Sequence, residues 1–125
     1  MSTYAPNSPH SYRASSVLTA SPGQLIVMLY DGARRFLSQA TVAMGAGDIP
    51  AAHNKLTRAE NIIRHLRNTL DMEQGGQIAE RLQAIYTFSL SHLREARFEQ
   101  NPRKLDEVNE MLGKLRESWA TIASE

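Results

Sequence analysis

Apolar side chains recur at spacings of three and four through most of this sequence, and three short breaks divide the pattern into four segments. The breaks are Gly45-Ala46-Gly47, Gly75-Gly76 and Asn101-Pro102. Such spacing places apolar side chains on one face of an α-helix, and no segment has the alternation typical of a half-buried strand. The sequence therefore predicts an all-α protein with four amphipathic helices.

Residues that commonly cap helices mark the expected start of the first two helices. Thr19-Ala20-Ser21 precedes Pro22, and Asp48 lies two residues before Pro50. We expect the first helix to run to about Met44 and the second to end before Gly75-Gly76. Their predicted apolar faces are Leu25, Ile26, Leu29, Ala33, Phe36, Leu37 and Ala40 in the first, and Ala52, Leu56, Ala59, Ile63, Leu66 and Leu70 in the second.

The third helix should fade around Gln100, and the fourth should start at Asn101-Pro102. Their predicted apolar faces are Ile78, Leu82, Ile85, Tyr86, Ser89, Leu93 and Ala96, and Leu105, Val108, Leu112, Leu115, Trp119 and Ile122. The connections between the four helices are short and force neighbouring helices to be antiparallel. We therefore predict an antiparallel up-down four-helix bundle over residues 19–125.

Residues 1–18 differ in composition from the rest of the chain. Pro6 and Pro9 stand among several Ser, Thr and Asn residues, which disfavours a regular helix. Tyr12, Val17 and Leu18 are nevertheless apolar enough to lie on another surface. We expect an irregular N-terminal arm with a few apolar anchors.

Charge and composition exclude several classes of function. The 125 residues include 14 Lys and Arg against 13 Asp and Glu, a net charge of +1 that disfavours nucleic acid as a partner. The absence of Cys excludes disulfides and thiolate chemistry. No apolar stretch is long enough to insert into a membrane, and the first residues do not resemble a signal peptide. We expect a soluble protein made in the cytoplasm.

The first helix carries more apolar side chains than a bundle core needs. Residues 25–30 form the run Leu25-Ile26-Val27-Met28-Leu29-Tyr30. On a helical wheel Val27 and Met28 fall opposite the core face. Either the N-terminal arm or a partner should cover them, because leaving such side chains in water forgoes about 1.5 to 3 kcal/mol each.

The chemistry-bearing residues give no support to catalysis. Bundles with di-iron sites need Glu-x-x-His motifs, and no Glu here has a His three residues later. His53 superficially resembles the phosphate-accepting histidine of phosphotransfer bundles, but Leu56 and Thr57 stand where that pattern has Lys and Gly. A solvated surface histidine is the simpler interpretation. A signalling or scaffold bundle that uses His53 stays open as the alternative function.

Several strings closely resemble the FliS family of flagellar secretion chaperones. They are Tyr12, residues 17–22 (Val-Leu-Thr-Ala-Ser-Pro), residues 25–33 (Leu-Ile-Val-Met-Leu-Tyr-Asp-Gly-Ala), and the later Leu70-Asp71, Gly76-Gln77-Ile78-Ala79, Leu105-Asp106-Glu107-Val108 and Trp119. The resemblance covers residues 12–120. It implies a four-helix protein that is not an enzyme and needs no cofactor or metal.

The resemblance also implies partners and a site. Members of the family bind the C-terminal helical segment of flagellin one to one in the bacterial cytoplasm, keep it from polymerising early, and deliver it to a membrane protein of the flagellar type III export gate. A chaperone for such a segment needs apolar grooves that accept an amphipathic helix. The residues expected to form the groove and its arm are Tyr12, Val17, Leu18, Leu25, Ile26, Val27, Met28, Leu29 and Tyr30.

Overall fold

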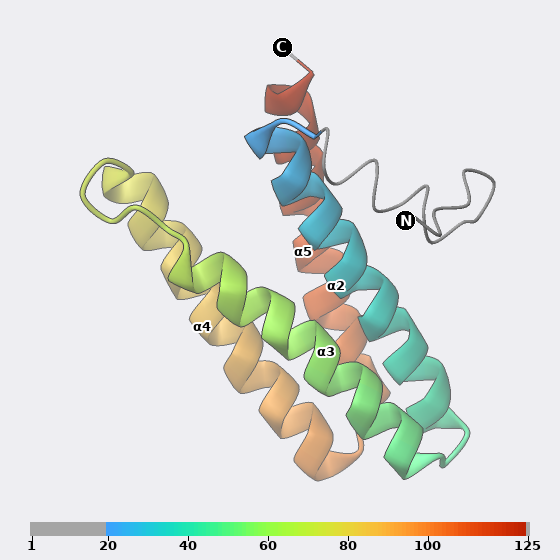
Figure 1. Cartoon of the computed structure of the whole chain (residues 1–125). Coiled ribbons are helices and arrows are strands. Elements are labelled where there is room, and N and C mark those ends of the chain that lie inside the picture. The colour runs from blue at the N-terminus through green and yellow to red at the C-terminus, as the bar shows by residue number, and fades with distance from the viewer. Residues whose placement is uncertain (1–19, 125) are drawn as a thin grey trace, which may run out of the picture.

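A computed structural model describes residues 20–124, which form four α-helices and no strand. The helices are α2 (Pro22–Gly45), α3 (Ile49–Asn68), α4 (Gly76–Glu99) and α5 (Pro102–Ala123). Each runs antiparallel to the one before it, and α5 returns alongside α2 (Figure 1). The predicted all-α, up-down four-helix architecture is confirmed. The predicted arm, residues 1–18, lies outside the described residues.

Side-chain caps fix three of the four helix starts. Ser21 and Asp48 accept hydrogen bonds from the backbone N–H groups of the first turns of α2 and α3, and Asn101 does the same for α5. Each of these helices also has Pro in its first turn, where the missing N–H costs nothing. Gly75, which precedes α4, makes no side-chain cap. The starts of α2, α3 and α5 are those that the sequence predicted.

The core is built from aliphatic and small side chains of all four helices, with two tyrosines. Ala33, Ala40, Ala52 and Ala59 are fully buried, and their small size lets α2 and α3 approach closely. The larger members are Tyr30, Leu37, Leu56, Ile63, Leu66, Leu82, Tyr86, Leu90, Leu93, Leu105, Val108 and Leu112. Trp119 and Leu115 pack against this core and are only partly buried.

The two helix pairs separate at one end of the bundle. In Figure 1, α2 and α5 form one pair and α3 and α4 the other, and the pairs diverge toward the end that holds the start of α2 and the α3–α4 turn. Gly23 lies close to α5 at this end, because a Cβ added to it would stand 3.2 Å from the Cβ of Ala123. The α2–α5 pair therefore stays closed where the two pairs part.

Two residues were wrongly predicted to lie in the core, and both are at the end where the helix pairs diverge. Ile78 is 69% exposed and Ile122 is 58% exposed. Within residues 20–124, no other helix covers these side chains once the pairs have separated. Leu90, which the sequence pattern did not place in the core, is buried instead.

The second helix ends before Gly75-Gly76 as predicted, but it does not include Leu70, which was expected on its apolar face. α3 stops at Asn68, and Leu70 lies in the connection that follows. The Asp71 carboxylate accepts hydrogen bonds from the N–H groups of Glu73 and Gln74, so this connection has its own turn.

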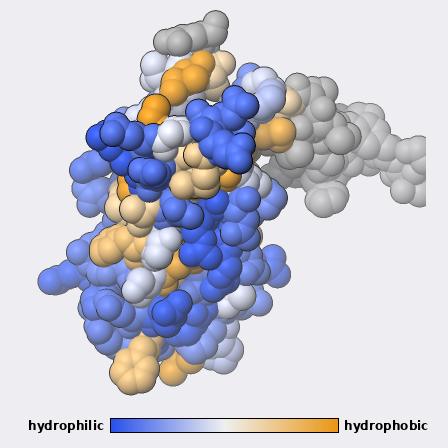
Figure 2. Space-filling model, turned by 90° about the vertical axis from the view of Figure 1, so that its left-hand side faces the viewer, coloured by the Kyte–Doolittle hydropathy of each residue, from blue (hydrophilic) through white to orange (hydrophobic). Residues whose placement is uncertain are grey.

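The surface carries scattered apolar side chains in a largely hydrophilic setting. Figure 2, viewed from the left-hand side of Figure 1, shows separate hydrophobic groups among hydrophilic side chains. Phe88 and Phe98 of α4 are exposed, as is Val42 of α2. None of the helices within residues 20–124 is both long and apolar enough to cross a membrane.

Candidate functional site

The start of α2 is held in place by a reciprocal cap. The Ser21 hydroxyl accepts a hydrogen bond from the Gln24 N–H (3.2 Å), and the Gln24 side chain accepts one from the Ser21 N–H (2.9 Å). This capping box fixes the first turn of α2, at the end where the helix pairs part. The capping box therefore keeps the following apolar run, residues 25–30, helical.

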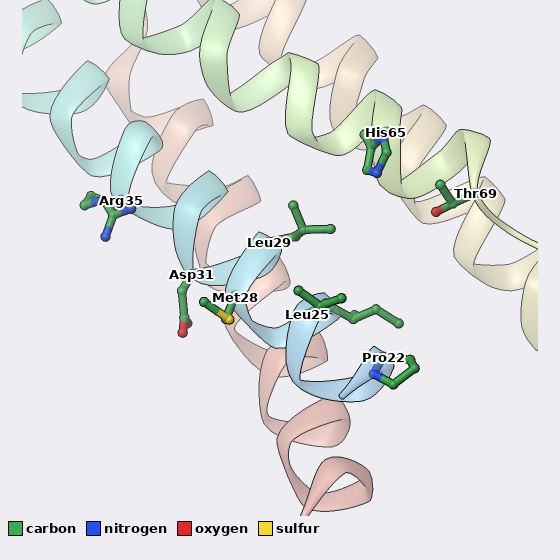
Figure 3. Close-up of a pocket in the computed structure, with 9 residues that line it drawn as sticks. Pro22, Leu25, Met28, Leu29, Asp31, Arg35, His65 and Thr69 are labelled. Carbon is green, nitrogen blue, oxygen red and sulfur yellow. The ribbon is translucent and has the colours of Figure 1, made fainter. Parts of the chain in front are cut away.

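An open groove lies between this part of α2 and the end of α3. Its volume is about 770 Å³. Figure 3 shows Leu25 and Leu29 of α2 projecting across the opening toward His65 of α3 and Thr69, the C-cap residue of α3. The full set of lining residues is Pro22, Leu25, Ile26, Met28, Leu29, Asp31, Arg35, His65 and Thr69. The groove has an apolar wall from α2 and a polar edge that Asp31 and Arg35 of α2 share with His65 and Thr69.

A second, smaller hollow lies on the other side of α2. It has a volume of about 280 Å³ and is lined by Gln24, Val27, Met28, Ala120, Ala123 and Ser124. The end of α5 therefore covers part of the back of α2, and Val27 is half-buried in consequence. Met28 lines both openings. The sequence predicted that the N-terminal arm or a partner would cover Val27 and Met28. Within the described residues, part of their cover comes from α5 instead.

The structure brings five of the nine predicted site residues together at the surface. Residues 25–29 are all half-buried, and four of them, all except Val27, line the larger groove. Tyr12, Val17 and Leu18 lie outside the described residues.

Tyr30 lies in the core rather than at the surface. It is fully buried, so its ring cannot contact another protein while the bundle stays closed. Its hydroxyl hydrogen-bonds to that of Tyr86 in α4, and the two ring centroids are 6.5 Å apart. Burial raises the pKa of both phenols. Tyr30 thus joins α2 to α4 beneath the apolar run.

The polar edge of the groove was not predicted from the sequence. Asp31 forms an ion pair with Arg116 of α5, with the Arg116 Nε 2.9 Å from Asp31 Oδ1, and this pairing raises the pKa of Arg116. Arg35 comes from the next turn of α2. His65 lies in the last turn of α3, and Thr69, the C-cap residue, follows it by four positions, a spacing that places both on one face. That spacing was the available signal, but the sequence alone did not show that this face meets α2.

His53 differs from the predicted solvated histidine. It is half-buried, and its Nε2 atom is buried without a hydrogen-bond partner among the described residues. A phosphate-accepting histidine must expose the attacking nitrogen to its donor. The geometry therefore does not favour the phosphotransfer alternative through Nε2. Within residues 20–124, no group of three or more His, Asp or Glu side chains is arranged to hold a metal ion.

These features define a class of protein. An antiparallel helical bundle that opens an apolar groove between two of its helices is suited to bind an amphipathic segment of another chain. The fold and the groove are those of a helical-bundle binding protein.

Comparison with known proteins gives the family. The model of the family described as "Flagellar protein FliS" matches residues 5–125. The flagellar secretion chaperone FliS of Salmonella typhimurium is 37% identical over 110 residues, which cover 87% of this chain and 82% of the relative. That of Vibrio cholerae is 36% identical over 111 residues (89% and 82%), and that of Bacillus subtilis is 30% identical over 109 residues (87% and 80%). The chain belongs to the FliS family of flagellar secretion chaperones, which are not enzymes.

Proposed function

We propose that this chaperone binds the C-terminal helical segment of flagellin in the α2–α3 groove, one to one, in the bacterial cytoplasm. Binding keeps flagellin from polymerising before export. The complex is then delivered to the flagellar type III export apparatus, where a membrane protein of the export gate receives it. The export role comes with the family, and the client and the delivery step are proposals.

The observation that supports this client site is the apolar wall of the groove. Leu25, Met28 and Leu29 are each only half-buried in the bundle. Full burial of such side chains against a partner is worth about 1.5 to 3 kcal/mol each relative to full exposure, and half-buried ones gain a part of that. An amphipathic helix offers the complementary stripe at spacings of three and four residues.

Titration calorimetry with a peptide of about 40 residues from the flagellin C-terminus of the same organism tests the client. We expect heat release at micromolar concentration, a negative heat-capacity change, and a gain of helix by circular dichroism. A peptide that gives neither heat nor a helical signal would contradict the proposal.

A matched pair of variants on α2 tests the site. Val27→Ser with Met28→Ser should keep cooperative unfolding and weaken peptide binding through Met28, which lines the α2–α3 groove, whereas Val27 lines only the hollow beside α5. Val42→Ser is the control, since Val42 is 73% exposed on the same helix and lines neither of these openings. Equal binding by the double variant and the control would place the client elsewhere.

A core variant separates loss of binding from loss of fold. Leu112 of α5 is fully buried, and Leu112→Ala should cost about 2 to 5 kcal/mol of unfolding free energy through the cavity it leaves. Peptide affinity of the remaining folded protein should stay near that of the wild type. If the Val27 and Met28 variant unfolds as Leu112→Ala does, these two residues belong to the core.

A further inference from the structure

The charged residues of α3 are almost all basic. α3 carries Lys55, Arg58, Arg64 and Arg67 but only one acidic residue, Glu60. Glu60 is 4% exposed and accepts two hydrogen bonds from Arg97 of α4, at 2.8 and 2.9 Å. The one negative charge of α3 is therefore buried and neutralised. The exposed surface of this helix is positive in a chain whose net charge is only +1.

Two of these cations lie along the junction of α2 and α3. The Lys55 Nζ is 5.8 Å and the Arg58 Cζ is 5.7 Å from the ring centroid of Phe36, a half-buried residue of α2. Phe36 follows Leu29 by two helical turns, so it continues the face that walls the groove. Arg35 lines the groove itself. Three cations thus border one apolar strip.

These three cations are not paired with the described acidic side chains. Arg35, Lys55 and Arg58 make no ion pair within residues 20–124. Asp31, the acidic residue that lines the groove, is paired with Arg116 of α5. The first 19 residues contain Arg13 and no Asp or Glu, so the N-terminal arm has no side-chain carboxylate to offer. A docked partner would meet unneutralised positive charge along this strip.

We infer that Arg35, Lys55 and Arg58 select a partner helix whose apolar stripe is flanked by Asp or Glu carboxylates. This inference rests on the proposed function, because it names the chemistry of the segment that the groove accepts. Charges at the edge of an interface mainly set association rate and specificity, and salt weakens them. The apolar wall would then hold the helix, and the cations would decide which helix enters.

Two synthetic amphipathic peptides of about 20 residues test it, with one apolar stripe in common and either Glu or Gln at the flanking positions. The Glu peptide should bind the wild-type protein roughly tenfold more tightly by fluorescence anisotropy at about 0.05 M salt, and the preference should shrink at about 0.5 M. Equal binding of the two peptides overturns this inference alone. Binding of neither also overturns the inference, whereas the proposed function stands or falls with the flagellin peptide.

Charge variants of the protein locate the preference. Arg35→Gln with Lys55→Gln and Arg58→Gln should abolish the preference for the Glu peptide, measured as the ratio of the Kd values of the two peptides for the same variant. Arg81→Gln with Arg94→Gln and Arg103→Gln is the control, since it removes the same charge from exposed residues of α4 and α5. Arg35→Lys with Arg58→Lys should retain the preference, because it retains the charge. A control triple variant that loses the preference equally would attribute it to net charge and overturn the inference.

Discussion

Tyr30 and Tyr86 give the core its one hydroxyl pair between α2 and α4 among the described residues. One of the two hydroxyls donates a hydrogen bond to the other in a place that water does not reach. A buried hydroxyl that loses its partner costs about 1 to 3 kcal/mol. The pair therefore fixes how α2 and α4 face each other beneath the groove.

The pair predicts loss of stability in alkaline solution. Burial raises the pKa of both phenols above the ordinary value, so the folded protein keeps them protonated where the unfolded chain ionises. Their contribution is fully present below the unfolded pKa of about 10, and it is lost as pH rises above that value toward the folded pKa. Denaturant unfolding followed from about pH 8 to pH 11 should show a falling free energy of unfolding.

The control for this prediction is Tyr30→Phe with Tyr86→Phe. It removes both titrating groups together and leaves no unpaired hydroxyl. Its unfolding free energy should fall less steeply above pH 10 than that of the wild type. Identical slopes would mean that the alkaline loss comes from other groups.

The ion pair of Glu60 and Arg97 predicts an asymmetric response to mutation. Arg97 also donates to the Thr57 hydroxyl at 3.0 Å, so its guanidinium joins α4 to α3 at two points. Arg97→Met should lower the free energy of unfolding by roughly 2 to 4 kcal/mol, because it leaves the buried Glu60 carboxylate unpaired while some solvent still reaches that carboxylate. The double variant Glu60→Met with Arg97→Met should recover most of that loss in thermal unfolding. A double variant less stable than Arg97→Met would contradict this account.

At the scale of helices, local sequence predicts starts better than faces. Ser21, Asp48 and Asn101 predict where their helices start, because an N-cap interacts only with the first turn of the helix that it precedes. Whether Ile78 or Ile122 is buried depends on where the helix pairs diverge, and that is set by contacts between distant segments. The spacing of three and four therefore predicts each helix correctly, but it does not show where along the helix the buried face begins and ends.

The cap of α2 gives a prediction at this scale. Ser21→Ala should destabilise the protein by about 0.5 to 2 kcal/mol, since the Gln24 N–H loses its acceptor. Amide exchange at Gln24 should speed up more than exchange in the middle of α2. Ser91→Ala is the control, because Ser91 is exposed on α4 and makes no side-chain hydrogen bond among the described residues. Equal losses of stability and equal amide exchange at Gln24 in the two variants would show that the cap does not stabilise α2.

At the scale of the whole molecule, one wall of the groove was predictable and the other was not. The run at residues 25–29 is more apolar than a helix with one buried face requires, and that excess is visible in the sequence. The placement of His65 and Thr69 opposite it follows from how α3 crosses α2. Tyr30 belongs to the same run but faces inward, because it continues the buried face with Ala33 and Leu37.

The N-terminal arm leads to a prediction about the whole chain. Tyr12, Val17 and Leu18 are apolar residues that precede the groove's first lining residue, Pro22, by ten, five and four positions. If they cover the apolar wall in the free protein, the client must displace them, and their docking energy is subtracted from client affinity. An arm held by one aromatic and one aliphatic side chain would cost about 1 to 3 kcal/mol, or roughly tenfold to a hundredfold in apparent Kd.

Deletion of residues 1–18 tests this competition. The shortened protein should unfold at lower denaturant concentration and bind more of a dye that reports exposed apolar surface. It should bind the flagellin peptide with equal or higher affinity, because nothing then competes for the α2 wall. Full-length protein with Tyr12→Ser and Leu18→Ser should behave in the same direction, which separates loss of the anchors from loss of chain length. A shortened protein that is as stable as the full chain but binds the peptide much more weakly would show instead that the arm contacts the client directly.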